Sequence, residues 1–201
     1  RRAVLSHAAI FLAGQFSRDK VMGGFVALYR GINVGGKHSV KMEALCALHE
    51  GLGHRDVQSY IQSGNVVFLS SGTAAAIAKK LTAAFASEFG FTAKIVLIEA
   101  KRWTEIVKSN PHAVFAATNP KLVHLGLCEG EPSAAGLQEL LTKTGGTETF
   151  TIGKGIVYLY APDGFGTSKF AAGMEKAAGV PMTVRNWRTV EALQALVELI
   201  A

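Results

Sequence analysis

The residues best suited to chemistry lie in one basic, glycine-rich segment, Arg30-Gly31-Ile32-Asn33-Val34-Gly35-Gly36-Lys37. It follows a predicted strand and precedes a predicted helix. Glycines let a backbone approach a ligand closely, and amide groups at the start of a helix favour anions. Arg30, Asn33 and Lys37 could add charge and directed hydrogen bonds. The segment therefore predicts a site for a small anion. The alternative is a glycine-rich turn in which Ser39 caps the next helix.

A second polar segment, Gln62-Ser63-Gly64-Asn65, is expected to form the turn of a β-hairpin. In a β-α-β-β-α-β unit the third strand runs antiparallel beside the first, so this turn reaches the sheet end that carries Arg30. The first set of candidate ligand-binding residues is therefore Arg30, Gly31, Asn33, Gly35, Gly36, Lys37, Gln62, Ser63 and Asn65. A hydrogen-bond network that only holds the two loops together is an equally open interpretation.

Two later segments add basic and polar residues. Asp163-Gly-Phe-Gly-Thr-Ser-Lys169 is a glycine-rich entry to a helix, and Arg185-Asn186-Trp187-Arg188-Thr189 precedes the last helix. Lys169, Arg185 and Asn186 complete the candidate ligand-binding set, although Asn186 also suits a helix cap and Trp187 a core anchor. The sequence leaves open whether the loops of the two halves form one site.

The residue types that usually carry catalysis are not arranged for it. Cys46 lies on the apolar face of a predicted helix and Cys128 at the end of an apolar strand, so both are expected to be structural. The histidines have no metal-ligand spacing. We therefore predict no metal and no cofactor, identify no catalytic residue and leave enzymatic activity undecided. Two cysteines are too few for a disulfide framework, which favours a reducing, cytoplasmic setting.

The elements that must position these residues follow the order β-α-β-β-α-β twice. Helical and strand periodicities predict one unit over residues 22–100 and a second over 122–201 with an additional terminal helix, joined by a helical connector over 101–121. The fold class is therefore α+β, as a tandem duplication of two ferredoxin-like units. The strands Ile95–Ile98 and Ile156–Tyr160 are apolar at successive positions, which predicts that both faces of each sheet are covered.

Composition narrows the function classes. The chain has 201 residues, of which 49% are hydrophobic and 18% charged, as is typical of a globular protein. Its formal charge of +6 is concentrated in residues 1–21, and outside them 17 basic and 14 acidic residues leave a net charge of +3. That excess is small for a nucleic-acid-binding surface. Residues 1–21 are expected to be an extension outside the fold, with a native amphipathic segment and a secretory signal as the alternatives. No apolar run has the ~18 residues of a membrane span.

Three segments together are specific enough to resemble a known family: Arg30–Lys37, Tyr60-Ile-Gln-Ser-Gly-Asn-Val-Val-Phe68 and Arg185-Asn-Trp-Arg-Thr-Val190. They resemble domain of unknown function 1697, a family of small bacterial proteins, over about residues 24–201. Asp163–Lys169 also resembles that family's Gly-x-Gly-x-Ser-Lys stretch, with Thr167 where arginine is common, and Arg188 stands where the family usually has asparagine. The resemblance implies an α+β duplication and a cytoplasmic setting, but no activity.

The expected function is binding of a small anionic or phosphorylated ligand at the glycine-rich basic loops. Nucleic-acid binding is the first alternative, because ferredoxin-like sheets also bind RNA through aromatic residues, for which Tyr29 and Phe68 are candidates. A protein-interaction module without a ligand is the second alternative. No membrane partner is expected, and the oligomeric state is left open.

Overall fold

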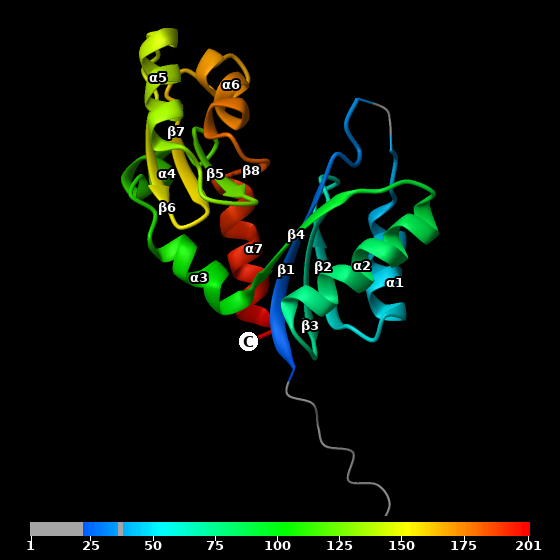
Figure 1. Cartoon of the computed structure of the whole chain (residues 1–201). Helices are drawn as coiled ribbons and strands as arrows, with labels where there is room; N and C mark the ends of the chain where they lie inside the picture. Colours follow the sequence, from blue (N-terminus) through cyan, green and yellow to red (C-terminus); the bar gives the residue numbers. More distant parts are fainter. Residues whose placement is uncertain (1–21, 36–37) are drawn as a thin grey trace, which may run out of the picture.

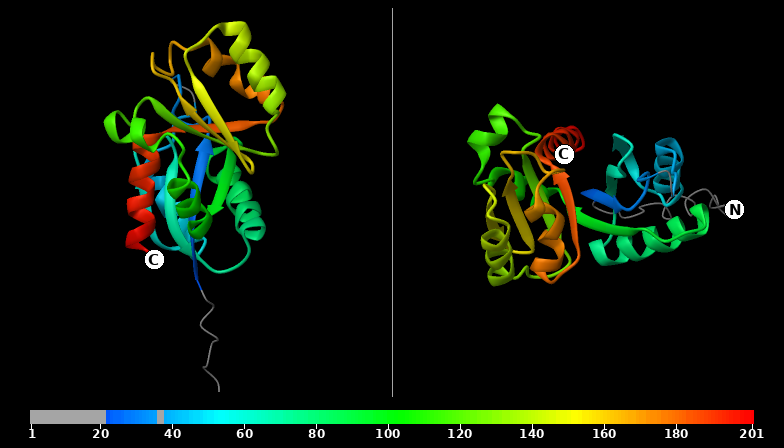
Figure 2. Two further views of the ribbon diagram at one scale, coloured as in Figure 1. Left: turned by 90° about the vertical axis from the view of Figure 1, so that its left-hand side faces the viewer. Right: turned by 90° about the horizontal axis from the view of Figure 1, so that it is seen from above.

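The computed structural model describes residues 22–35 and 38–201, which form two α+β halves side by side (Figures 1 and 2). The expected extension, residues 1–21, and the candidate residues Gly36 and Lys37 lie outside the described residues. The first half contains β1 (Gly23–Arg30), α1 (Met42–Gly51), β2 (Arg55–Tyr60), β3 (Asn65–Ser70), α2 (Ala74–Phe89) and β4 (Lys94–Glu99).

Two short helices, α3 (Ala100–Lys108) and α4 (Ala113–Thr118), connect the halves. The second half contains β5 (Val123–Cys128), α5 (Ala134–Thr144), β6 (Thr149–Gly153), β7 (Ile156–Tyr160), α6 (Lys169–Ala178), β8 (Met182–Asn186) and the terminal helix α7 (Trp187–Leu199). No helix among residues 22–35 and 38–201 is long and apolar enough to cross a membrane.

Each half is built on a four-stranded antiparallel sheet. The strand orders are β2-β3-β1-β4 and β6-β7-β5-β8, so strands in corresponding chain positions occupy corresponding sheet positions. In the first sheet Arg30 pairs with Lys94, while Phe25, at the other end of β1, pairs with Glu99. Arg30 and Lys94 therefore lie at one end of this sheet, and Glu99 lies toward the other end.

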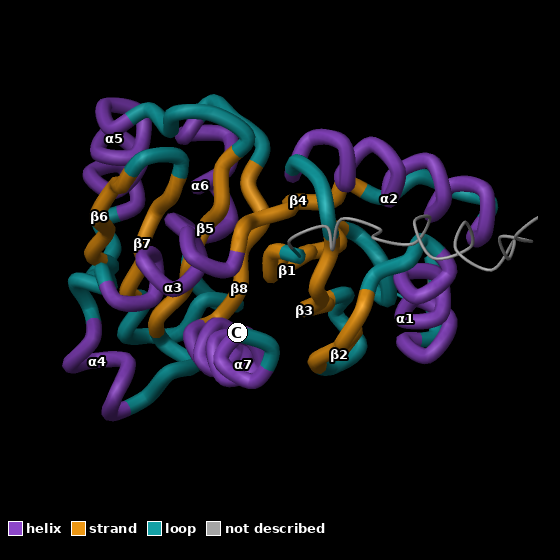
Figure 3. Tube along the Cα trace, turned by 90° about the horizontal axis from the view of Figure 1, so that it is seen from below, coloured by secondary structure: helices purple, strands orange, loops and turns teal. Residues whose placement is uncertain are grey.

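Both faces of both sheets are covered, as the doubly apolar strands predict. Alternate β1 residues such as Phe25, Ala27 and Tyr29 pack with α1 and α2 on the outer face of the first sheet. Val157 and Leu159 pack with α5 and α6 on the outer face of the second. The inner faces of the two sheets meet α3 and α7, which lie between the halves (Figure 3).

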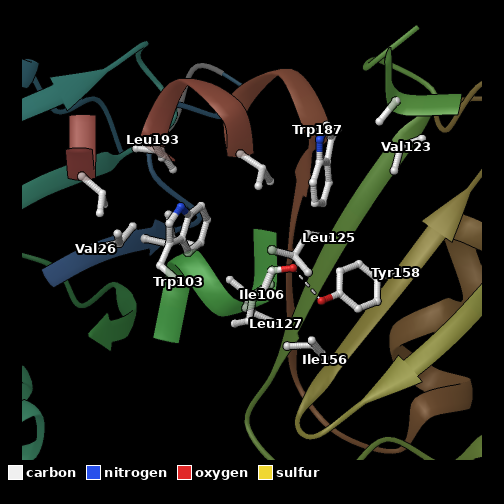
Figure 4. Close-up of a cluster of buried hydrophobic side chains, with 14 of the residues drawn as sticks. Val26, Trp103, Ile106, Val123, Leu125, Leu127, Ile156, Tyr158, Trp187 and Leu193 are labelled. Carbon is white, nitrogen blue, oxygen red and sulfur yellow. Dashed lines mark hydrogen bonds between the residues drawn. The ribbon is translucent and has the colours of Figure 1, made fainter. Parts of the chain in front are cut away.

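A central cluster of buried side chains joins the halves. Trp103 of α3 and Trp187 of α7 are 0% and 4% exposed, and Trp187 is thus the core anchor that the sequence suggests. They pack with Val26 of the first sheet and Leu125 of the second (Figure 4). The hydroxyl of Tyr158 donates a 2.8 Å hydrogen bond to the carbonyl of Ile106, which ties the second sheet to α3.

Two local predictions are wrong. Ser39 does not cap α1, because the helix begins only at Met42, with Lys41 at the N-cap position and no side-chain cap. The hairpin turn lies one residue earlier than expected, so Asn65 is the first residue of β3 and pairs with Tyr60. The turn consequently includes Ile61, which has φ +48°.

Candidate functional site

The loop after β1 and the β2–β3 turn meet at one end of the first sheet, as the topology predicts. Asn33 makes this contact, because its Nδ2 donates to the carbonyl of Gln62 at 2.7 Å and to that of Val40 at 2.9 Å. The amide of Tyr29 also donates to the carbonyl of Gly64 at 2.7 Å. The side chain of Asn33 is therefore committed to holding the loop against the turn.

Asn65 organises the turn from within. It is 0% exposed. Its Nδ2 donates to the carbonyl of Tyr60 at 3.0 Å and to the Ser63 hydroxyl at 2.8 Å, while its Oδ1 faces the second half of the protein. All its hydrogen-bonding groups are thus used, which matches the rule that buried polar groups are paired.

Arg185 of β8 reaches from the second half into this end of the first sheet. Its Nε donates to Asn65 Oδ1 at 2.7 Å, and its Nη2 donates to the carbonyls of Tyr29 at 2.9 Å and Ser63 at 3.1 Å. Its Nη1 donates to the carbonyl of Val184 at 3.0 Å. These partners are all neutral, and burial lowers the pKa of Arg185 to about 10. Among the described residues no carboxylate lies within 4.0 Å of this guanidinium.

Arg30 brings a second guanidinium to the same sheet end. It shares strand parity with Val26 and Leu28, whose side chains lie in the central cluster, so it faces the second half. There its Nη2 lies 2.7 Å from Oε2 of Glu175 on α6. The two side chains are 35% and 46% exposed. We call this region, made of Arg30, Ser63, Asn65, Glu175 and Arg185, the junction.

The other predicted residues are distributed differently. Asn186 caps α7, since its Oδ1 accepts from the amide of Thr189 at 3.0 Å. Gln62 and Lys169 have exposed side chains that make no hydrogen bond with the described part of the chain. Gly31 and Gly35 have φ of +80° and +62°, and a Cβ at either would meet open space. The glycines thus serve backbone conformation, not close packing.

Sequence reasoning missed two features. Glu175 carries no signal of its own, because an acidic residue on an exposed helix face is ordinary. The second is a buried chain in which the Tyr29 hydroxyl is hydrogen-bonded to His49 Nε2 at 2.9 Å and His49 Nδ1 to His54 Nδ1 at 3.1 Å. Burial lowers the pKa of His49 to about 3 and of His54 to about 4. This chain lies in the outer core of the first half, and both histidines are neutral at pH 7.

The hairpin turn depends on Gly64. Its φ is +74°, and a Cβ would lie 2.6 Å from Ile32 Cδ1 and 2.7 Å from Tyr29 Cβ. Gly64→Ala should therefore add overpacking to the backbone strain and lower the free energy of unfolding by about 3 kcal/mol. Gly90 is a matched control, with the same φ of +74° and nothing within 4 Å of a Cβ. Gly90→Ala should cost only about 1 kcal/mol, from backbone strain alone. Equal losses in urea titrations of the two variants would contradict the packing argument.

The fold and the junction define a class of protein with two four-stranded α+β halves and a polar, arginine-bearing contact between them. Residues 22–158 match the family model described as "Protein of unknown function (DUF1697)". The chain belongs to this family, as the resemblance of its three motifs implies. A search of curated proteins found no match.

One of the similar solved structures supports the fold. The chain is similar to a conserved bacterial protein from Streptococcus pneumoniae, with a TM-score of 0.63 and 21% identity over 88% of this chain and 99% of that one. A structure described as a provisional chlorite dismutase has a TM-score of only 0.24 and 11% identity, over 90% of this chain and 99% of that one. The first similarity supports the arrangement of helices and strands, and the second carries no argument.

Proposed function

We propose that the protein binds a small anionic or phosphorylated molecule at the junction. The observation that carries the proposal is Arg185, a partly buried guanidinium from the second half that is held by neutral groups of the first. Buried charges in proteins are usually paired with an opposite charge. An anion at the junction would supply that charge, and it would favour the closed contact between the halves.

Arg30 supports the same proposal. It directly follows Tyr29 in β1, and the carbonyl of Tyr29 accepts a hydrogen bond from Arg185. Its pairing with Glu175 is solvent-exposed, and such pairs contribute only about 0–1 kcal/mol to stability. An incoming anion can therefore replace Glu175 at small cost. Glu175 in this account competes with the ligand for Arg30.

This competition predicts opposite effects for the two members of one ion pair. Glu175→Gln should tighten anion binding by roughly fivefold, and Arg30→Gln should weaken it by at least as much, because removing a charge contact near a surface changes binding by about 1 kcal/mol. Thermal unfolding should be followed with phosphate, pyrophosphate, nucleotides, sugar phosphates and coenzymes. A ligand at 100 times its dissociation constant should add about 2.7 kcal/mol of stability.

The matched controls are Glu139→Gln and Lys143→Gln, which remove the same charges from an exposed pair on α5 with N···O 3.5 Å. They should leave the ligand response unchanged. If no anion stabilises the wild type, or if Glu175→Gln and Arg30→Gln shift its effect in the same direction, the proposal is wrong and Arg30–Glu175 is only a structural contact.

The nucleic-acid alternative receives less support from the aromatic residues. Tyr29 and Phe68 are 1% and 0% exposed and lie in the outer core of the first half, so they cannot stack on bases. Short oligonucleotides belong in the same thermal series. Stabilisation by them alone, lost with added salt, would favour nucleic-acid binding over the small-anion proposal.

Two further inferences concern the origin of the fold and the cellular compartment of the protein. We infer that the halves are two ferredoxin-like units related by duplication, over residues 22–100 and 122–201, with 101–121 as the connector. The equivalent strand orders support this inference. We also infer a reducing, cytoplasmic setting, which the two free cysteines Cys46 and Cys128 support.

A further inference from the structure

A cavity of about 410 Å³ lies between the halves, and its lining includes none of the junction residues. Its first-half wall is β4 from Val96 to Glu99, together with Ala74 at the start of α2. Glu99 pairs with Phe25, whereas Arg30 pairs with Lys94, so this wall extends toward the opposite end of the first sheet. Val96 and Glu99 lie two and five residues from Lys94, which correspond to about 7 Å and about 17 Å of antiparallel strand. The cavity is therefore a separate place in the fold.

The inner wall of the cavity is apolar. Ile106 of α3, Leu127 of β5 and Ile156 of β7 line it and are also members of the central cluster, where Figure 4 draws them close together. Val96 and Ile98 line it from the first sheet. The volume falls within the ~300–1,000 Å³ range of small-molecule sites, which are typically apolar with a few polar groups that orient the ligand.

The charged groups of the lining are Arg102, Lys154 and Glu99. Arg102 is 3.4 Å from Glu105 and donates to the carbonyl of Lys154 at 3.4 Å, so it is held beside the β6–β7 turn. The exposed ammonium of Lys154 makes no ion pair within the part of the chain that the structure describes. Burial raises the pKa of the Cys128 thiol to about 11, so this lining group is neutral. Two carboxylates border this lining, because Glu105 pairs with Arg102 and Glu131 accepts from the amide of Gly155 at 3.3 Å. Lys154 is therefore the lining cation with no carboxylate within 4.0 Å among the described residues.

We propose that this cavity binds a small amphipathic carboxylate, with its apolar body against the central cluster and its carboxylate beside Lys154 and Arg102. Such a ligand would bury apolar surface against Ile106, Leu127 and Ile156. The carboxylates of Glu99, Glu105 and Glu131 in and beside the lining disfavour a dianion, so a monoanionic head group fits better than a phosphate. The chemistry differs from that proposed at the junction.

Calorimetric titration with decanoate, decanol and decyltrimethylammonium tests the proposal, because the three probes share a chain and differ in head-group charge. Decanoate should bind at least tenfold more tightly than decanol, and decyltrimethylammonium should bind most weakly. Lys154→Gln should weaken decanoate binding roughly fivefold and leave decanol unchanged. Equal binding of the three probes, or a preference for the cation, would overturn the proposal.

A cavity-filling pair locates the binding. Ala74 lines the cavity at the start of α2, and its neighbour Ala75 is exposed and does not. Ala74→Phe should reduce decanoate affinity at least tenfold, whereas Ala75→Phe should not change it. Both variants can be checked for cooperative unfolding before titration. Undiminished binding by folded Ala74→Phe would show that decanoate binds elsewhere, and the proposal would fail.

Discussion

Replacing Arg185 by glutamine is expected to lower the free energy of unfolding by about 3 kcal/mol, which corresponds to a decrease of roughly 10 °C in Tm for a chain of this size. The side chain donates to Asn65 Oδ1 and to the carbonyls of Tyr29, Ser63 and Val184. Glutamine is too short to replace these bonds, so it leaves acceptors of the first half without a donor. Urea and thermal unfolding measure the loss.

Two further variants separate the possible causes. Arg185→Lys keeps the charge but lacks the planar guanidinium with its several N–H donors. Its free energy of unfolding should therefore lie between those of the wild type and Arg185→Gln. Arg188→Gln removes the same charge three residues later, from an exposed position with no hydrogen bond to the described residues. It should change stability by less than about 0.5 kcal/mol. Equal losses for Arg185→Gln and Arg188→Gln would contradict a specific contact between the halves.

Acid should destabilise the protein well above the pH at which carboxylates protonate. Burial holds the pKa of His49 at about 3, and those of His54 and His124 at about 4, below their ordinary value of 6.5. Below pH 6.5 the unfolded chain binds protons that the folded chain does not, so stability falls as the pH falls. Between pH 6.5 and 4 each histidine should account for about 3 kcal/mol.

One substitution isolates the buried pair. His54 stacks on Phe68 with ring centroids 4.4 Å apart, and His54→Phe should keep that packing while removing a titrating group. Urea unfolding at pH 7, 6, 5 and 4 should give a flatter pH dependence for this variant than for the wild type. A wild-type stability that stays constant from pH 7 to 4.5 would contradict neutral burial.

Much of the fold could be predicted because local and global patterns agree. The doubly apolar strand Ile156–Tyr160 correctly indicated a sheet covered on both faces. Gly90, with φ +74°, ends α2 where the periodicity stops. Strand boundaries were less accurate at the hairpin, because Asn65 extends the ladder with its own side chain and moves the turn to Ile61, a residue that rarely adopts positive φ.

The candidate site could be predicted only in part. Strand topology correctly placed the β2–β3 turn beside the loop after β1, since antiparallel neighbours share an end. It could not indicate that Arg185 crosses between the halves or that Glu175 pairs with Arg30, because these contacts span 120 and 145 residues. Such contacts depend on how the two sheets pack against α3 and α7, and a local sequence pattern does not determine that packing.

The most direct test of the central claim, that an anion binds between the two arginines of the junction, is an NMR titration with pyrophosphate that observes arginine Nε–Hε signals. The signal of Arg185 can be assigned by its loss in Arg185→Lys, and those of Arg30 and Arg188 by their glutamine variants. The signals of Arg30 and Arg185 should shift together with one dissociation constant, while that of Arg188 stays in place. Unchanged Arg30 and Arg185 signals at saturating pyrophosphate, or an equal shift of Arg188, would contradict the account.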